Sequence, residues 1–345
     1  EDGIRDKRGG LVGSEMCIRD REEPMRIHRR LALGASVLAT VALVGTAGGG
    51  AIVSAQDDPV FIVGSDGWYE AELVGEIYAQ ALEGGGYEVD RSGLAIGARP
   101  ARIAAYDAGQ VNIMPEYLGF GLTFFTAAED AEEDIAAIEA TGDIEADSAS
   151  LEQVFELRGV PSTVLAASDG EDINTAVVRP DTADEFGLAT MSDLAAVQDD
   201  LRFGLPPDCE TNVAGCKGAW ESYGVTWPPS NLELIPPCGA EMALALAGNA
   251  IDVAWLCSTQ PDIAQNGWVV LEDDQVTQPL GNLVPIVRND VLEQVEGGAD
   301  AIAAVLDPVS AALTTEAITE LAVRVAVDQE DIEDVASDFL AGLGG

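Results

Sequence analysis

The chain has 345 residues, of which 47% are hydrophobic, and its formal net charge is -44. This length and apolar content predict a globular protein with a sizeable core, and exclude a disordered chain. So acidic a surface repels phosphate backbones, which excludes nucleic acid as a partner, and it is also typical of adaptation to salt. The only histidine is His28, in a segment predicted below to be removed. Histidine-based catalytic and metal sites are therefore excluded from the mature protein.

The first residues are expected to lie outside the fold. Residues 1–24 have no coherent hydrophobic period, and the stretch 14–21 resembles translated sequencing-adaptor read-through. We expect this segment to be an artefact of the gene model, with the true start at Met25.

Residues 25–55 are predicted to be a signal peptide. A basic start precedes the apolar run 31–46, and the small residues 53–55 suit cleavage before Gln56. The alternative is an uncleaved membrane anchor, because 31–55 approaches the roughly 20 residues that a spanning helix needs. Either way the chain is predicted to be exported, to the periplasm or the outer face of the cytoplasmic membrane.

From residue 60 onward, strands and helices alternate. An apolar run predicts a strand at 60–63, and the helical pattern after it carries apolar residues on one face from 73 to 82. Further strands are predicted at 88–95 and 111–114, a helix at 101–108, a solvated acidic helical stretch at 127–157, and an extended segment at 163–167. This alternation predicts a mostly parallel sheet with helices on both faces.

A turn at 168–170 begins a second block of the same kind. Its predicted strands are 175–178, 201–204, 232–235, 252–257 and 268–271, and its predicted helices are 192–197, 218–223 and 240–247. A strand at 283–287 follows, and the rest to Leu340 is predicted to be helical, with Asp328 capping the last helix. Two such blocks predict two lobes, with a ligand beyond the carboxyl ends of the strands or between the domains.

Four cysteines remain after Cys17 is set aside: Cys209, Cys216, Cys238 and Cys257. An even number in an exported chain favours disulfides, and four cysteines allow three connectivities. The short loop between Cys209 and Cys216 favours a local bond, which leaves Cys238 for Cys257. A zinc site is the alternative, but no CxxC spacing supports it. No metal and no cofactor are expected.

Several motifs occur in a specific order. GSDGWYE (64–70), IGAR (96–99) and MPEYLG (114–119) follow or end the first strands, and FGLPPDC (203–209), IDVAWLCST (251–259) and VVLEDD (269–274) come later. This succession resembles the osmoprotectant-binding family of ABC importers for glycine betaine, choline and carnitine, over nearly all of 60–343. The resemblance implies an α/β, two-lobed type II periplasmic-binding fold with a ligand cleft between the lobes. Lobe 1 would comprise 59–170 and 282–345, and lobe 2 would comprise 171–281.

The resemblance also implies a function. The chain would be an extracytoplasmic solute-binding protein, not an enzyme, and would act as a monomer that delivers a quaternary-ammonium solute to a membrane permease. A trimethylammonium group has no N–H to donate, so the faces of aromatic rings hold it. Tyr117 matches the cage tyrosine of the family and Trp68 stands where relatives usually have Phe, although each could be an ordinary packing aromatic. Trp220, Trp227, Trp255 and Trp268 are interpreted as core residues. The predicted binding residues are Ser65, Asp66, Trp68, Tyr69, Glu116, Tyr117, Arg179, Ser258 and Thr259.

Departures from the family favour one ligand. Asp66 replaces a lysine and Ala98 replaces a Ser or Thr, at positions that help some relatives hold a betaine carboxylate. An aspartate there would repel a carboxylate, which favours choline. Arg179 could still clamp a carboxylate, or could form a structural salt bridge. Cys257 stands where relatives often have an aromatic residue, which predicts a smaller or differently composed cage.

Three other readings remain open. Glu116 beside Tyr117 could be an acid/base pair of an enzyme, although close carboxylates are inevitable in so acidic a chain. The ligand could be another small solute, such as an amino acid or an aromatic amine. A retained anchor would instead indicate a membrane-tethered sensor.

Overall fold

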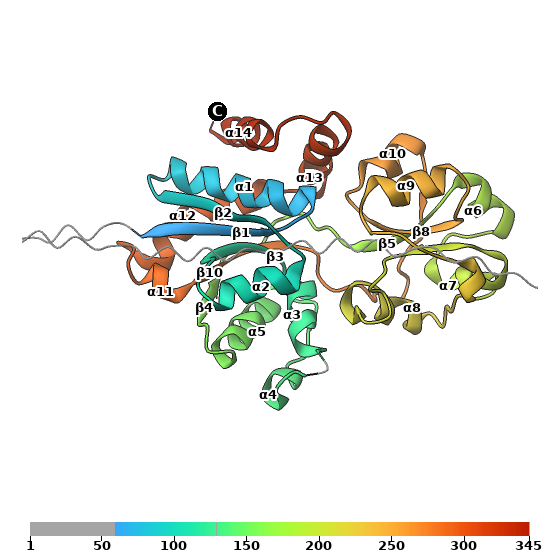
Figure 1. Cartoon of the computed structure of the whole chain (residues 1–345), viewed down its shortest axis with the longest axis horizontal. Helices are drawn as coiled ribbons and strands as arrows, with labels where there is room; N and C mark the ends of the chain where they lie inside the picture. Colours follow the sequence, from blue (N-terminus) through green and yellow to red (C-terminus); the bar gives the residue numbers. More distant parts are fainter. Residues whose placement is uncertain (1–58, 129, 345) are drawn as a thin grey trace, which may run out of the picture. The chain divides into compact units, whose positions relative to one another are not determined.

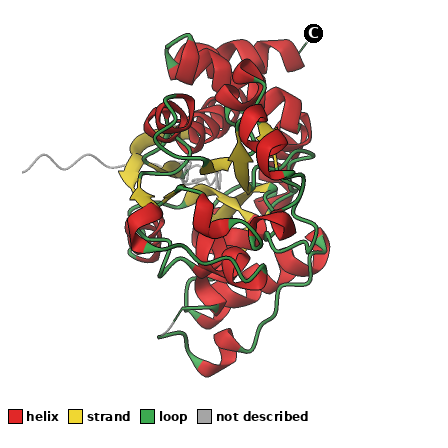
Figure 2. Cartoon of the chain, turned by 90° about the vertical axis from the view of Figure 1, so that its right-hand side faces the viewer, coloured by secondary structure: helices red, strands yellow, loops and turns green. Residues whose placement is uncertain are grey.

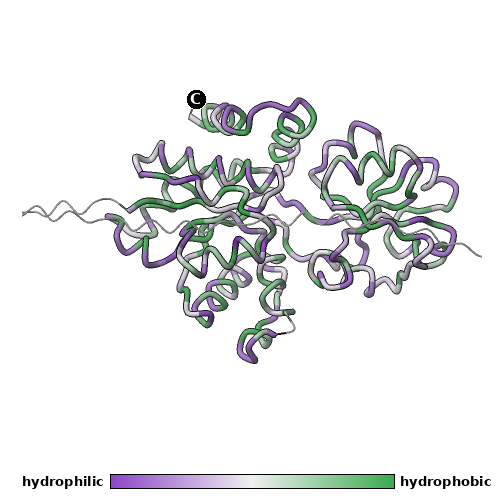
Figure 3. Tube along the Cα trace, in the orientation of Figure 1, coloured by the Kyte–Doolittle hydropathy of each residue, from purple (hydrophilic) through white to green (hydrophobic). Residues whose placement is uncertain are grey.

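The computed structural model describes residues 59–128 and 130–344. The expected artefact at 1–24 and the expected signal peptide at 25–55 lie outside these residues. The described chain forms two five-stranded sheets, and helices cover both faces of the strands (Figures 1 and 2). Apolar residues run through the interior of both sheets (Figure 3). Inner strands such as Ile113–Tyr117 and Val253–Cys257 are buried throughout because both of their faces are covered, whereas the edge strand Glu88–Gly97 is mostly exposed or half-buried.

The first sheet has the strand order β2-β1-β3-β10-β4, and the part of the chain built on it is called lobe 1. Its strands are β1 (Val60–Asp66), β2 (Glu88–Gly97), β3 (Ile113–Tyr117), β4 (Ser162–Val164) and β10 (Leu283–Arg288). β1 pairs in parallel with β2 and β3, whereas β10 is antiparallel to β3 and β4. The chain therefore leaves lobe 1 after β4 and returns in β10.

The second sheet, with the order β7-β6-β8-β5-β9, builds lobe 2. Its strands are β5 (Asn174–Val178), β6 (Phe203–Leu205), β7 (Leu232–Leu234), β8 (Val253–Cys257) and β9 (Val269–Val270). β6 pairs in parallel with β7 and β8, whereas β5 is antiparallel to β8 and β9. Each sheet thus contains one antiparallel strand, and in lobe 2 that strand is the first.

Helices fill both faces of each sheet. In lobe 1 they are α1 (Tyr69–Gly84), α2 (Arg99–Asp107), α3 (Leu118–Thr126), α4 (Glu133–Ala136), α5 (Ile144–Leu157), α11 (Asn289–Leu292), α12 (Gly298–Ala312), α13 (Thr315–Ala322), η4 (Val323–Val327) and α14 (Ile332–Leu343). In lobe 2 they are α6 (Pro180–Phe186), α7 (Met191–Leu194), η1 (Gln198–Asp200), η2 (Val213–Lys217), α8 (Gly218–Ser222), η3 (Pro229–Asn231), α9 (Ala240–Ala247) and α10 (Pro261–Asn266). Among the described residues no single helix is long and apolar enough to cross a membrane, although α12 with α13 and η4, bent by 80°, passes that test as a pair.

Four apolar clusters form the core, two in each lobe. The first packs α1, α12, α13 and α14 against one face of the first sheet, and another packs α2, α3 and α5 against the other face. In lobe 2, Trp220 and Trp255 are fully buried in one cluster and Trp268 lies in the other, while Trp227 packs at the edge. The interpretation of these tryptophans as core residues is confirmed.

The structure modifies two predictions about the helices. The predicted helical stretch 127–157 contains α4 and α5, which a turn with Gly142 at φ 75° separates. Asp147 accepts hydrogen bonds from the amide and hydroxyl of Thr141 (2.7 and 2.8 Å), a local arrangement that competes with helix. The cap of the last helix is Asp331, whose carboxylate accepts from the Glu333 amide, and not Asp328. Gln329 at φ 56° interrupts the helical backbone after Asp328.

Both disulfides are confirmed as Cys209–Cys216 and Cys238–Cys257. The first closes the loop before α8, and the second ties the start of α9 to the end of β8. With all four thiols oxidised, the alternative of a four-cysteine zinc site is excluded.

The two segments that join the lobes run against each other. The Asp172 amide donates to the Gly281 carbonyl (3.0 Å), and Glu171 forms a bridge with Asn282. A Cβ on Gly281 would lie 2.2 Å from the carbonyl oxygen of Asp172. Only glycine permits this approach of two backbones.

Gly281→Ala is therefore expected to push the two connections apart and to cost about 1–3 kcal/mol of the free energy of unfolding, measured by urea denaturation. Gly84→Ala, at a position with no atom within 4 Å of the added Cβ, is the matched control and is expected to be neutral or slightly stabilising. Equal stability of the two variants would contradict the prediction.

Candidate ligand-binding site

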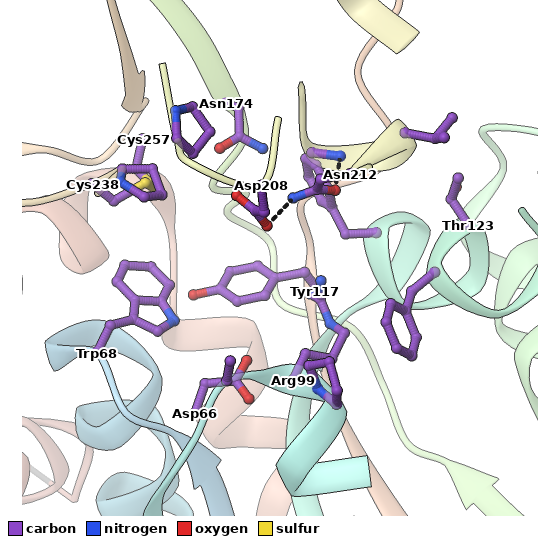
Figure 4. A pocket seen from close by; sticks show the side chains of 18 of the residues that line it. Asp66, Trp68, Arg99, Tyr117, Thr123, Asn174, Asp208, Asn212, Cys238 and Cys257 are labelled. Atoms are coloured by element: carbon purple, nitrogen blue, oxygen red, sulfur yellow. Dashed lines mark hydrogen bonds between the residues drawn. A yellow bond between two sulfur atoms is a disulfide. The ribbon is translucent and has the colours of Figure 1, made fainter. Parts of the chain in front are cut away.

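A cavity of about 920 Å³ opens at one edge of both sheets (Figure 4). Its lobe 1 wall follows the carboxyl ends of β1, β2 and β3, and its lobe 2 wall follows the carboxyl ends of β6 and β8. Asn174 at the amino end of β5 completes the wall, because that strand runs the other way. The ligand position predicted from strand ends agrees with this cavity.

Aromatic side chains cover much of the wall. Trp68, just before α1, and Tyr117, the last residue of β3, stack with ring centroids 6.0 Å apart and ring planes 26° apart. Figure 4 shows both rings beside the same space. Phe120 and Phe124 also line the cavity from lobe 1, and Trp255 of lobe 2 lies directly behind the wall with no exposed surface.

Asp66 lines the cavity, but its charge is not free. Arg102, which is 1% exposed, donates to Asp66 (2.7 Å) and to Glu116 (2.8 Å), and Arg99 donates to Glu116 at 2.9 Å. Two guanidinium groups therefore balance two carboxylates. The expectation that Asp66 alone would repel a ligand carboxylate is corrected, because Arg102 compensates it.

Glu116 lies behind the wall instead of lining the cavity. Burial alone would raise the pKa of Glu116, but Arg99 and Arg102 outweigh it and hold this pKa at about 2. A carboxylate with so low a pKa is a poor proton donor or acceptor near neutral pH. Glu116 is thus neither a ligand contact nor the acid/base group of the enzyme alternative, and instead holds Arg99 at the cavity.

A second buried group of carboxyls links the lobes. The Tyr117 hydroxyl donates to Glu70 at 2.6 Å, and the Thr259 hydroxyl, from lobe 2, bonds the other oxygen of Glu70 at 2.7 Å. Asp172 accepts from the Ser258 hydroxyl and the Thr259 amide, both at 3.1 Å, and lines the cavity. Ser258 and Thr259 therefore support carboxyl groups from behind the wall instead of facing the ligand.

Arg179 does not reach the cavity. Its guanidinium donates to the carbonyls of Leu246 and Ile251 (2.9 and 2.6 Å) and to Asp252 (3.0 Å). Of the two roles considered for Arg179, the structure shows the structural salt bridge, with Asp252, and not a clamp on a ligand carboxylate. Because β5 is antiparallel to its neighbours, its carboxyl end points away from the cavity. Arg179 follows that end, five residues and roughly 17 Å along the strand direction from Asn174.

The other predicted contacts lie near the wall without lining it. The Ser65 hydroxyl accepts from the Ala95 amide (2.9 Å), and the buried Tyr69 hydroxyl has no hydrogen-bond partner among the described residues. Cys238 and Cys257 do line the cavity, so a disulfide stands where an aromatic side chain was expected in relatives (Figure 4). The sequence analysis missed Arg99, Asp172, Asn174 and Asp208 as wall residues. Their position in the sequence could have identified them, since each lies just after, just before or at the start of a strand with one end at this edge.

The chain was compared with known proteins. The family model described as the substrate binding domain of ABC-type glycine betaine transport system matches residues 60–342. The chain belongs to this family. Its members are extracytoplasmic binding components that work with an ABC permease, and the family is a transport family, not an enzyme family.

Individual relatives are distant. The glycine betaine-binding protein YehZ of Escherichia coli is 27% identical over 292 residues, which cover 82% of this chain and 90% of that protein. A glycine-betaine-binding protein of Pseudomonas aeruginosa is 23% identical over 287 residues, covering 81% and 86%.

Among solved structures, a glycine betaine/carnitine/choline ABC transporter protein has a TM-score of 0.62 at 20% identity, covering 82% of this chain and 98% of that one. Apo YehZ has a TM-score of 0.59 at 24% identity, with the same coverage. The predicted α/β type II periplasmic-binding fold is confirmed.

Proposed function

We propose that the chain is the extracytoplasmic receptor of an ABC importer and binds a quaternary-ammonium osmoprotectant, choline or glycine betaine. The observation that carries the proposal is the stacked pair Trp68 and Tyr117 at the wall of a cavity that both lobes line. Ring faces attract a trimethylammonium group electrostatically, and the attraction is strongest where water is excluded. The glycine betaine-binding relatives and the choline-binding fold neighbours support the same ligand class.

The charges at the wall favour a cation. Among the described residues, the carboxyls of Asp66, Asp172 and Asp208 line the cavity together with one guanidinium, that of Arg99. Arg102 offsets Asp66, and Glu116 engages Arg99, so Asp172 and Asp208 are the wall carboxyls that no described cation pairs with. Choline, which lacks a carboxylate, is the first candidate, and glycine betaine is the second because Arg99 offers a donor to its carboxylate.

Calorimetry of the purified chain against choline, glycine betaine and carnitine tests the proposal. We expect saturable heat with a stoichiometry of one for choline or glycine betaine, and none for an amino acid or an aromatic amine. No heat with any of the three quaternary-ammonium compounds would refute the ligand class.

We further propose that the exported chain is a monomer that hands its ligand to a membrane permease. The family's place in ABC importers supports this role. Mass spectrometry of the mature N-terminus distinguishes the receptor from a tethered sensor, since cleavage before Gln56 gives the former and a retained N-terminal segment the latter.

A further inference from the structure

Among the described residues, three buried carboxyl groups form no salt bridge: Glu70, which is 1% exposed, Asp147, which is 1% exposed, and Asp172, which is 4% exposed. Asp147 lies away from the cavity and is held by the Thr141 amide and hydroxyl, whereas Glu70 and Asp172 both accept hydrogen bonds from Thr259. Asp66 and Glu116 are also buried, yet both pair with Arg102. Because an unpaired buried carboxylate is costly, the pair Glu70–Asp172 requires a proton or a counter-charge.

The pair lies where a ligand cation would sit. Asp172 lines the cavity directly, and Glu70 holds the hydroxyl of Tyr117, whose ring forms the wall with Trp68. Glu70 comes from α1 of lobe 1, while Asp172 stands on one of the two segments that join the lobes. A charge on this pair therefore acts on both the aromatic wall and the connection between the lobes.

The surroundings of the pair offer hydroxyls and acids. Tyr69 and Tyr117 face the pair, with Asp262 beside Tyr69 and Asp66 beside Tyr117, and the Ser258 and Thr259 hydroxyls bond the two carboxyls. The guanidinium of Arg102, which pairs with Asp66, is already engaged by Asp66 and Glu116.

Burial sets the protonation of the pair. Burial, and then the charge of Asp172, raise the pKa of Glu70 well above its usual range. Burial also raises the pKa of Asp172 to about 6, although Thr259 and Ser258 donate hydrogen bonds that lower it. The ligand-free pair therefore keeps a proton into the neutral range.

We propose that a cationic ligand bound against Trp68 and Tyr117 displaces this proton from the Glu70–Asp172 pair and becomes the counter-charge of both carboxylates. The inference rests on the proposed function. The displaced proton passes through the cavity that Asp172 lines into solvent. Where that proton lies on the Glu70 oxygen that faces Thr259, the Thr259 hydroxyl accepts from it before release and donates to the carboxylate afterwards. By linkage, release of one proton makes the association constant rise with pH, by up to about tenfold per unit below the pKa of the pair.

The test is calorimetry of choline binding to the purified chain from about pH 5 to about pH 8, a range that covers the titration of the pair. Each pH is measured in two buffers that differ in ionisation enthalpy. We expect the two buffers to give different heats, corresponding to release of up to about one proton per choline, and an affinity that rises with pH and then levels off. Choline binding with identical heats in both buffers and no pH dependence overturns the inference and leaves the proposed function standing. Absence of choline binding overturns the inference, and the proposed function falls with it only if glycine betaine and carnitine also give no heat.

Variants assign the proton to the pair. Glu70→Gln, which keeps groups able to bond Tyr117 and Thr259, is expected to remove most of the proton release and flatten the pH profile. Asp172→Asn leaves Glu70 buried, and is expected to reduce the release. Asp147→Asn removes another buried carboxyl without a salt bridge, outside the cavity, and is the matched control that keeps proton release. Undiminished release in both pair variants overturns the assignment. The measurement on the parent chain stands even where a variant does not fold.

Discussion

Replacing Arg102 with methionine is expected to lower the free energy of unfolding by about 3–5 kcal/mol. Arg102 is buried, and its guanidinium donates to Asp66, Glu116 and the Pro115 carbonyl. Methionine fills a similar volume but leaves two buried carboxylates with only Arg99 as compensation. Denaturant unfolding of the purified variant measures the loss.

The pH dependence of this loss has a definite sign. The folded pKa of Glu116, about 2, lies below its unfolded value, so the stability it contributes is present above that unfolded value and is lost as pH falls toward about 2. The difference between the parent and Arg102→Met should therefore shrink on acidification. Arg324→Met is the control, because Arg324 pairs with the more exposed Glu330 and Asp338, where solvent screens the charges, and its loss should be much smaller than that of Arg102→Met. A loss for Arg102→Met no larger than for the control would contradict the argument.

Replacing Tyr117 with alanine is expected to weaken choline binding about 30-fold, from a desolvated cation–π contact of about 2 kcal/mol. The substitution removes one of the two stacked rings and the hydroxyl that bonds Glu70. Calorimetry on the variant measures the affinity, with thermal unfolding to show that it is folded.

The Tyr117→Phe variant distinguishes the contribution of the ring to choline affinity from that of the hydroxyl. This variant keeps the ring and loses only the hydrogen bond to Glu70, so we expect its affinity to fall by less than about tenfold. If Tyr117→Ala bound choline as tightly as the parent, Tyr117 would be an ordinary packing residue and the aromatic wall would not be the ligand site.

Strands and long helices were predictable from the sequence to within a few residues. The apolar runs that form β1, β5, β8 and β10 are buried on both faces of their sheets. Their hydrophobic residues are therefore nearly consecutive and can be recognised in the sequence. α6 and α10 were missed, although each begins with a proline and ends at a glycine in the left-handed region, Gly187 and Gly267. Proline at the first helical position and glycine after the last are local signals that would have identified both.

The site was partly predictable. Asp66, Trp68 and Tyr117 line the cavity as expected, because they end or follow parallel strands that meet at one edge. Arg179 was placed there by the same rule and is wrong, since the direction of β5 depends on its pairing with β8 and β9. Asp172, which precedes that strand, and Asn174, its first residue, take the place that Arg179 was expected to fill.

The order of motifs along the chain was sufficient to recognise the family, the α/β fold and the aromatic pair, because those features depend on short local patterns that occur in a fixed order. The charge state and ion pairing of the buried carboxyls, in contrast, depend on the tertiary structure. Whether Asp66 is a free charge depends on Arg102, 36 positions away, and whether Glu70 has a partner depends on Thr259, 189 positions away. The ionisation of a buried carboxyl depends on which groups surround it in space, and only the packing of the two lobes brings those groups together.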